Sequence, residues 1–220
     1  HEESFLIVVD YEVFHDISES LDDYVEGLER QGVEVHVEPW SPGGFEELRA
    51  LVFNYVDEEG IDGALLVGTL PAAWYEQTAF NVHEEFPTDL VLQDRDAVWT
   101  DADEDGVLDG HTQLKLDLYL SRIQGTPEDL REYFDRVDYY RHVGPLVNVA
   151  AFVFSDDTWA ERFETQSQYL DRLYDQVIIM HEATHTTLEN YVAVLTGDGA
   201  EFVYQATHST CSELRITEFD

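Results

Sequence analysis

A short stretch in the middle of the chain carries carboxylates at alternate positions, followed by a glycine that permits a sharp turn, Gly106. This Asp-x-Asp-x-Asp-Gly-x-x-Asp spacing is typical of the opening of an EF-hand-type calcium loop, because Ca²⁺ takes six to eight oxygen ligands. We predict that the stretch binds Ca²⁺. The predicted ligands are the side chains of Asp101, Asp103, Asp105 and Asp109 and the backbone carbonyl of Val107.

The predicted shell is not complete within the loop. An EF-hand loop ends on a Glu at its twelfth position, and this chain has Thr112 there. Another residue must then close the shell, and we expect Asp94 or Asp96 to do so. The alternative interpretation is a solvated acidic turn in a very acidic protein.

A second group of reactive side chains lies near the end of the sequence. His208 follows an apolar run, and Cys211, the only cysteine, comes shortly after it. A thiolate can attack a scissile carbonyl while an imidazole moves the proton to the leaving amine. The pair is a candidate catalytic dyad. On spacing alone, a structural histidine and an idle thiol remain the alternatives.

A third motif, His181-Glu182-Ala-Thr-His185, matches the H-E-x-x-H signature of zinc peptidases. That chemistry needs both histidines one turn apart on a continuous helix, with the Glu as general base. The β-branched run before the motif predicts a strand, and its threonines suit a cap for a helix that begins near Leu188. We therefore expect a strand-to-helix loop. A zinc metallopeptidase remains an alternative function.

Composition limits the partners. The chain has 220 residues, enough for one large domain or two small ones, and a formal net charge of −37. Nucleic acid is not an expected partner, because phosphate binding needs Lys and Arg, and an anionic membrane surface is disfavoured for the same reason. No apolar run approaches the ~20 residues of a membrane span.

The surroundings of the protein can also be inferred. An acidic surface with one lysine, Lys115, suits a salt-rich environment in which self-repulsion is screened. A calcium loop of this kind suits extracellular calcium levels. We expect a secreted or cell-surface protein in which one free cysteine forms no internal disulfide.

Apolar periodicity predicts the elements that carry these residues. In the first part, buried strands at 5–9 and 64–67 and a half-exposed strand at 33–37 alternate with helices at 17–28 and 45–55. Residues 75–113 show little periodicity, 114–120 alternate like a strand, and Thr126 begins a helix that ends near Gly144. This rhythm predicts a parallel α/β sheet with right-handed crossovers.

The rhythm then repeats. Strands are expected at 147–154, 177–180 and 202–206, and helices at 160–174 and 187–195. We predict two adjoining α/β subdomains with mostly parallel sheets flanked by helices. Residues 1–144 form the one with the calcium loop, and residues 145–220 form the one with His208 and Cys211.

Several blocks of the sequence form one linked pattern. They are Phe86-Pro-Thr-Asp-Leu90, Asp94-Arg-Asp96, Trp99-Thr-Asp101, Ser121-Arg-Ile123, and the opening runs Phe5 to Val9 and Gly63 to Trp74. The pattern resembles the gingipain family of cysteine peptidases, in the clan that contains the caspases, and it covers most of the chain. One departure is the segment from Leu114 to Tyr119, where Asp117 replaces an expected Glu.

The resemblance implies a caspase-like fold and a calcium-stabilised cysteine endopeptidase that acts on a protein or peptide. It implies His208 and Cys211 as catalytic residues, and Cys211-Ser-Glu-Leu-Arg215 looks like the family's catalytic-Cys block. In that family the two residues lie at the ends of neighbouring strands. A crossover between parallel strands needs about a dozen residues or more, whereas only two residues separate His208 from Cys211 in this chain. Either a loop and strand are missing between them, which we favour, or the chain is a degenerate relative. A non-catalytic calcium-binding surface module is therefore the leading alternative.

Overall fold

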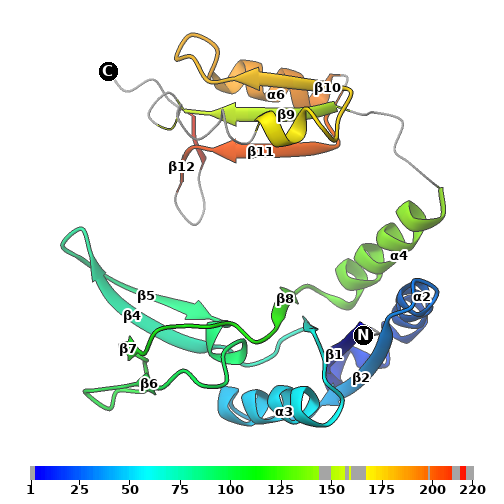
Figure 1. Cartoon of the computed structure of the whole chain (residues 1–220), viewed down its shortest axis with the longest axis vertical. Coiled ribbons are helices and arrows are strands. Elements are labelled where there is room, and N and C mark those ends of the chain that lie inside the picture. Colours follow the sequence, from blue (N-terminus) through cyan, green and yellow to red (C-terminus); the bar gives the residue numbers. More distant parts are fainter. Residues whose placement is uncertain are drawn as a thin grey trace. The chain divides into compact units, whose positions relative to one another are not determined.

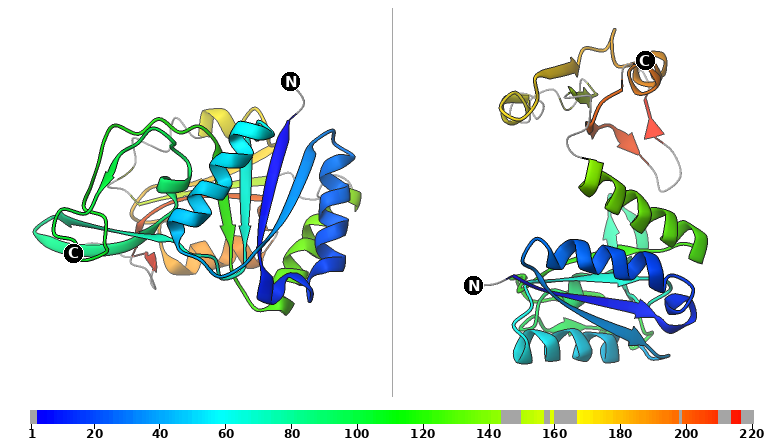
Figure 2. Two further views of the ribbon diagram at one scale, coloured as in Figure 1. Left: turned by 90° about the horizontal axis from the view of Figure 1, so that it is seen from below. Right: turned by 90° about the vertical axis from the view of Figure 1, so that its right-hand side faces the viewer.

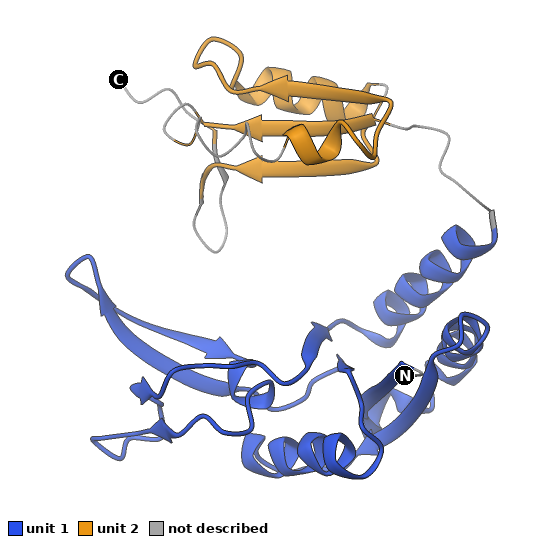
Figure 3. Ribbon diagram, viewed as in Figure 1, with its two compact units in different colours: residues 1–142 blue, residues 143–220 orange. Residues whose placement is uncertain are grey.

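The chain forms two compact units, residues 1–142 and residues 143–220 (Figure 3). The computed structural model describes residues 3–143, 150–156, 159, 167–197, 199–209 and 214–216. Within those ranges no helix has both the length and the apolar character needed to cross a membrane. The division between the units falls between His142 and Val143.

Unit 1 is built on a four-stranded, all-parallel sheet (Figure 1). Its order is β2-β1-β3-β8, with β1 at Ser4–Asp10, β2 at Glu34–Trp40, β3 at Gly63–Val67 and β8 at Tyr119–Ile123. In the central register Ile7 lies between Val37 and Leu65. The continuous apolar runs of β1 and β3 fit this place, since both faces of a parallel sheet are covered.

Helices cover both faces of this sheet (Figure 2). They are α1 (Tyr11–Phe14), α2 (Ser18–Glu29), α3 (Phe45–Glu58) and α4 (Pro127–Val143). On one face Leu6 and Val8 pack with Leu48 of α3, and on the other Ile7 packs with Phe134 of α4. Alternate residues of β1 therefore belong to the two hydrophobic cores on opposite faces of the sheet.

The start of α4 shows how the sequence places a helix. Thr126 accepts a hydrogen bond from the Asp129 backbone N–H at 3.2 Å, and Asp129 accepts one from the Thr126 N–H at 2.9 Å. Pro127 occupies the first helical position, where its missing N–H costs nothing. The cap, the proline and the early acids make this helix start predictable.

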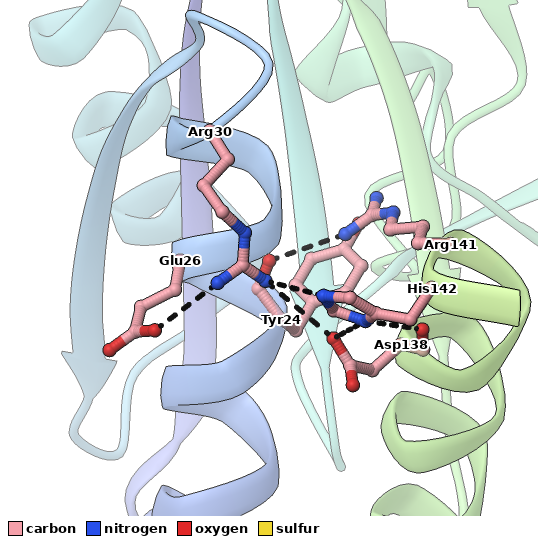
Figure 4. Close-up of polar contacts among 6 residues, drawn as sticks. All are labelled: Tyr24, Glu26, Arg30, Asp138, Arg141 and His142. Carbon is pink, nitrogen blue, oxygen red and sulfur yellow. Dashed lines mark hydrogen bonds and ion pairs between the residues drawn. The ribbon is translucent and has the colours of Figure 1, made fainter.

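The last turns of α4 are tied to α2 by a group of charged and aromatic side chains (Figure 4). The Arg141 guanidinium lies 4.7 Å from the centroid of the Tyr24 ring. An Arg30 nitrogen lies 3.3 Å from His142 Nε2, and His142 Nδ1 lies 3.1 Å from an Asp138 carboxylate oxygen. These contacts hold the end of α4 against α2.

Residues 75–113 are more regular than the sequence predicts. A long hairpin joins β4 (Ala73–Ala79) to β5 (Val82–Thr88), through Phe80 and Asn81 at φ values of 53° and 64°. Two positive φ values mark a type I′ turn, which suits the twist of paired strands. The hairpin escaped prediction because β5 is exposed almost throughout and so has no apolar alternation. The rest contains η1 (Leu90–Leu92), β6 (Trp99–Thr100) and β7 (Gly110–His111).

The strand predicted from the alternating leucines of 114–120 begins later, at Tyr119. The preceding residues instead run beside residues 93–95, where the Asp117 N–H donates to the Gln93 carbonyl at 2.7 Å. Leu118 is buried and Leu116 is half exposed. The leucines before Tyr119 therefore belong to an extended segment that this hydrogen bond holds in place, and not to a strand.

Unit 2 is a second, smaller α/β layer structure. Its parallel sheet has the order β10-β9-β11, with β9 at Ala150–Ser155, β10 at Gln176–Met180 and β11 at Phe202–Ala206. Phe152 and Phe154 contact Tyr191 of α6 (Leu188–Thr196), whereas Ala151 and Val153 pack with Leu170. Residues 167–170 are helical, and 160–166 of the expected helix lie outside the described residues.

A short antiparallel pair ends the described chain. It joins β12 (His208–Ser209) to β13 (Leu214–Arg215), with His208 opposite Arg215. Both larger sheets are parallel and flanked by helices, so the predicted α/β class is confirmed.

Candidate functional site

The acidic loop of residues 101–109 is fixed to the long hairpin by backbone hydrogen bonds. The Glu76 N–H donates to the Leu108 carbonyl at 2.8 Å, and the Leu108 N–H donates to the Trp74 carbonyl at 2.8 Å. These bonds form a parallel bridge between Tyr75 and Leu108. The loop therefore lies against β4, and the side chain of Glu76 is brought close to the carboxylates of the loop.

An aromatic cluster supports the base of the loop. The Tyr75 ring lies 5.7 Å from Phe86, 6.1 Å from Trp99 and 5.8 Å from His111, measured between centroids. Trp99 and His111, which belong to the paired strands β6 and β7, lie 4.9 Å apart. This packing gives the loop rigid ends, because each ring also buries area against its neighbours.

Inside the loop, the carboxylates organise the backbone. Asp101 accepts hydrogen bonds from the N–H groups of Asp105 at 3.2 Å and Gly106 at 2.9 Å. Asp105 accepts from the Val107 N–H at 2.9 Å. Gly106 has φ at 94°, a conformation that glycine adopts without steric cost. The chain thus closes into the tight turn that the Asp-Gly spacing predicts.

The structure brings the predicted acidic ligands together and adds one. Side-chain oxygens of Asp101, Asp103 and Asp105 lie within 4.8 Å of one another, and so do those of Glu76, Asp103 and Asp109. Asp103 belongs to both groups. Oxygens this closely gathered are a donor set suited to a hard divalent cation. The role of the Val107 carbonyl remains a prediction.

Glu76 is the site residue that sequence reasoning misses. Desolvation raises its pKa, and the negative charges of Asp105 and Asp103 raise it further. The Glu76 carboxylate is thus held beside other negative charges, and a bound cation would reduce the repulsion among them. No motif marks Glu76, because its position follows from the unpredicted hairpin and from the bridge at Tyr75.

Asp94, expected to close the calcium shell, has a structural role instead. It is buried, and its carboxylate accepts N–H groups from Asp96 at 3.0 Å, from Ala97 at 2.9 Å and from Lys115. The bond from the Lys115 N–H is the main cause of its lowered pKa. Asp96 is exposed and belongs to none of the metal-binding groups found among the described residues. Glu76 is better placed than either.

A histidine lies beside Glu76 on the other side of the hairpin. His83 Nε2 is 3.1 Å from a Glu85 oxygen and 3.5 Å from a Glu76 oxygen. The hydrogen bond with Glu85 raises the pKa of His83. The imidazolium form of His83 balances part of the negative charge near the loop.

In unit 2, His208 lies just after the carboxyl end of β11, as the sequence predicts. Its ring is exposed and lies 5.7 Å from the Trp159 ring, measured between centroids. Strand β9 is the neighbour of β11 in the sheet. The N–H of Asp156, which follows β9, donates to the Ala206 carbonyl at 2.8 Å and joins the two strands at this edge. Cys211 lies outside the described residues, in the segment between β12 and β13.

The H-E-x-x-H segment lies in a strand-to-helix turn. Strand β10 ends at Met180 and α6 begins at Leu188, with Thr187 as its cap. The His185 N–H donates to the Glu182 carbonyl at 2.7 Å within this turn. A zinc peptidase needs both histidines on a continuous helix, and the described backbone does not provide one here.

The chain matches no protein-family model, no curated protein and no solved structure. Across the described residues, every group with metal-binding geometry lies on the 101–109 loop or on the β4–β5 hairpin.

Proposed function

We propose that this protein is a calcium-stabilised cysteine endopeptidase with a caspase-like fold, similar to the gingipains. The observation that carries the proposal is the gathering of the acidic loop and Glu76 on the parallel α/β unit. The blocks that resemble the gingipain family run through this loop and its flanks. The implied substrate is a protein or peptide, and the implied location is outside the cell or at its surface.

Calcium has a structural role in this proposal. The residues that would hold it come from the loop and from β4, so the ion would add a side-chain link between two segments that already share backbone hydrogen bonds. A bound Ca²⁺ also neutralises part of the charge that the clustered carboxylates place there. Ca²⁺ that binds only the folded state raises its stability.

The peptidase chemistry is assigned to His208 and Cys211. The imidazole takes the thiol proton, and the thiolate attacks the scissile carbonyl carbon. As the peptide C–N bond breaks, the imidazolium gives that proton to the leaving amine, and a thioester forms. Water then hydrolyses the thioester and restores the thiol.

Support for His208 comes from its place at the carboxyl end of a parallel strand. This is the edge at which open α/β sheets present ligand-binding groups. An exposed imidazole at this edge is accessible to a substrate. The adjacent Trp159 ring offers an apolar wall against which a substrate side chain can pack.

The test is cleavage of an unstructured protein substrate and of a fluorogenic peptide library in Ca²⁺. We expect Cys211→Ala and His208→Ala each to reduce turnover at least about 10³-fold, as when a nucleophile or its base is removed. His185→Ala, an exposed histidine of the same unit, is the control and should leave turnover unchanged. Turnover that survives both substitutions would rule out this dyad.

A non-catalytic calcium-binding module is the second candidate. It is favoured by one observation: the acidic site lies wholly within unit 1, which has its own sheet and its own cores. This candidate predicts a calcium-dependent rise in the thermal midpoint. It also predicts no labelling of Cys211 by peptide electrophiles that react with cysteine peptidases.

A further inference from the structure

The β4–β5 hairpin carries a second group of metal-binding side chains, which lies next to the acidic loop but has a different chemistry. Carboxylate oxygens of Glu76 and Glu85 and a ring nitrogen of His83 lie within 4.8 Å of one another. The other two groups found among the described residues offer oxygen atoms only. Imidazole is a ligand that suits Zn²⁺ and related transition metals, whereas Ca²⁺ takes oxygen ligands.

The register of the hairpin places these three side chains on one face of the ribbon. Glu76 of β4 lies directly opposite Glu85 of β5. His83 comes two residues before Glu85 on the same strand, so both side chains point to the same side. Two carboxylates directly opposite each other repel. A cation that lies where the three side chains converge offsets this repulsion.

The separations between the ligand atoms fit a single metal ion. His83 Nε2 lies 3.1 Å from a Glu85 oxygen and 3.5 Å from a Glu76 oxygen. Two ligand atoms that each lie about 2.0–2.1 Å from one tetrahedral Zn²⁺ are about 3.3 Å apart. The two separations in the structure lie on either side of that value, so the imidazole and the carboxylates need only small rotations to share an ion.

The hairpin holds one ligand firmly and leaves the other two accessible (Figure 1). Glu76 belongs to the segment of β4 whose backbone is bonded to Leu108, and its side chain is 18% exposed. The side chains of His83 and Glu85 are 57% and 50% exposed. An ion can therefore arrive from solvent and meet an anchored carboxylate. With three protein ligands, a fourth position stays open to water.

Glu76 also belongs to the group that contains Asp103 and Asp109 of the acidic loop. A carboxylate has two oxygens, each of which can accept. Glu76 can therefore serve both groups at once, one oxygen for each. His83 and Glu85 belong to the hairpin group alone, so they distinguish the two sites.

We propose that Glu76, His83 and Glu85 bind one divalent transition-metal ion, with Zn²⁺ preferred over Ca²⁺ and Mg²⁺, at a site separate from the calcium loop. The ion is bound by Nε2 of the neutral His83 imidazole and by one oxygen of each Glu. It joins β4 to β5 through their side chains. Every ligand belongs to unit 1, so the site does not depend on the proposed peptidase.

The test is Zn²⁺ binding to the full chain in saturating Ca²⁺. NMR follows the ring signals of the histidines, and a His83→Gln variant assigns those of His83. We expect the His83 signals to shift and to saturate, and Zn²⁺ to remain bound when Mg²⁺ is added in excess. By calorimetry, His83→Gln and Glu85→Gln should each weaken Zn²⁺ binding at least about tenfold.

Two variants serve as controls. Glu84→Gln removes an equal charge from the opposite face of β5, and His185→Gln removes an exposed histidine of unit 2. Neither should change the effect of Zn²⁺ on the His83 signals. Ca²⁺ binding by His83→Gln should equal that of the parent, so failure of this site and failure of the calcium loop are distinguishable. The thermal midpoint of each variant verifies that it is folded.

Three results would overturn the proposal. One is an equal Zn²⁺ affinity in the parent, His83→Gln and Glu85→Gln, which is the result expected if His83 only forms ion pairs with the two carboxylates. Another is a set of Zn²⁺ shifts confined to His181 and His185, which would place the ion in unit 2. The third is full displacement of Zn²⁺ from His83 by Ca²⁺ or Mg²⁺.

Discussion

At the residue scale, Glu76 makes the proposed calcium site testable without disturbing the loop. Glu76→Gln removes one carboxylate from the group shared with Asp103 and Asp109. Desolvation and the nearby charges of Asp105 and Asp103 raise the pKa of Glu76, so the substitution relieves an unfavourable, partly buried charge when no cation is bound. We expect an unchanged or higher thermal midpoint in EDTA, and about tenfold weaker Ca²⁺ binding by calorimetry.

Glu84→Gln is the matched control, since Glu84 is an exposed acid of the same hairpin outside the metal-binding groups. It should leave both measurements unchanged. If Glu76→Gln behaves like this control, Glu76 is not a ligand.

Asp94 gives a prediction about pH. Its pKa is lowered by the Lys115 N–H and by two further N–H groups. A lowered folded-state pKa stabilises the protein above the ordinary pKa of Asp, and this contribution is lost as the pH falls through the folded-state value. We expect Asp94→Asn to lower the midpoint of urea unfolding at pH 7, and to lessen the further loss of stability on acidification.

The measurement is a series of urea unfolding curves between pH 7 and pH 2, for both proteins. Asp96→Asn, an exposed neighbour, should follow the parent protein at each pH. Parallel curves for the parent and Asp94→Asn would show that the Asp94 hydrogen bonds do not contribute in this way.

At the scale of elements, Arg122 joins β8 to the turn after β3 and to Asp89. Lysine keeps the charge but cannot donate to four oxygens at once. We expect Arg122→Lys to cost on the order of 2 kcal/mol in unfolding free energy. Chemical denaturation measures this cost. The double variant Arg122→Lys/Asp89→Asn should lose less unfolding free energy than the sum of the losses in the two single variants, because the two side chains interact.

The elements also show which parts of the fold can be predicted from sequence. Strands such as β1 and β3 are evident because burial on both faces requires continuous apolar runs. The β4–β5 hairpin is not, because exposed strands need no apolar pattern and Phe80 is an unusual residue for a type I′ turn. The site follows the same division. The spacing of the Asp residues is local and therefore predictable. Glu76 reaches the loop through a backbone bridge between two residues that are far apart in the sequence.

At the scale of the whole molecule, the net charge of −37 predicts a dependence on salt. Repulsion among surface carboxylates opposes the compact state and is screened within about 3 Å at molar ionic strength. We expect the thermal midpoint to rise steadily from low salt to 2 M KCl, with Ca²⁺ constant. A midpoint that stays level over this range would contradict the inferred salt-rich environment.

The position of β8 in the sheet has a consequence for the order of folding. Strands β1, β2 and β3 meet through short crossovers, whereas β8 joins β3 only after the chain has traversed residues 68–118. Closing so long a loop costs chain entropy before any strand contact compensates for it. An ion that clips the acidic loop to β4 shortens the free length within that excursion. Calcium should therefore accelerate the late docking of β8 in refolding experiments, while the earlier collapse of the first three strands keeps its rate.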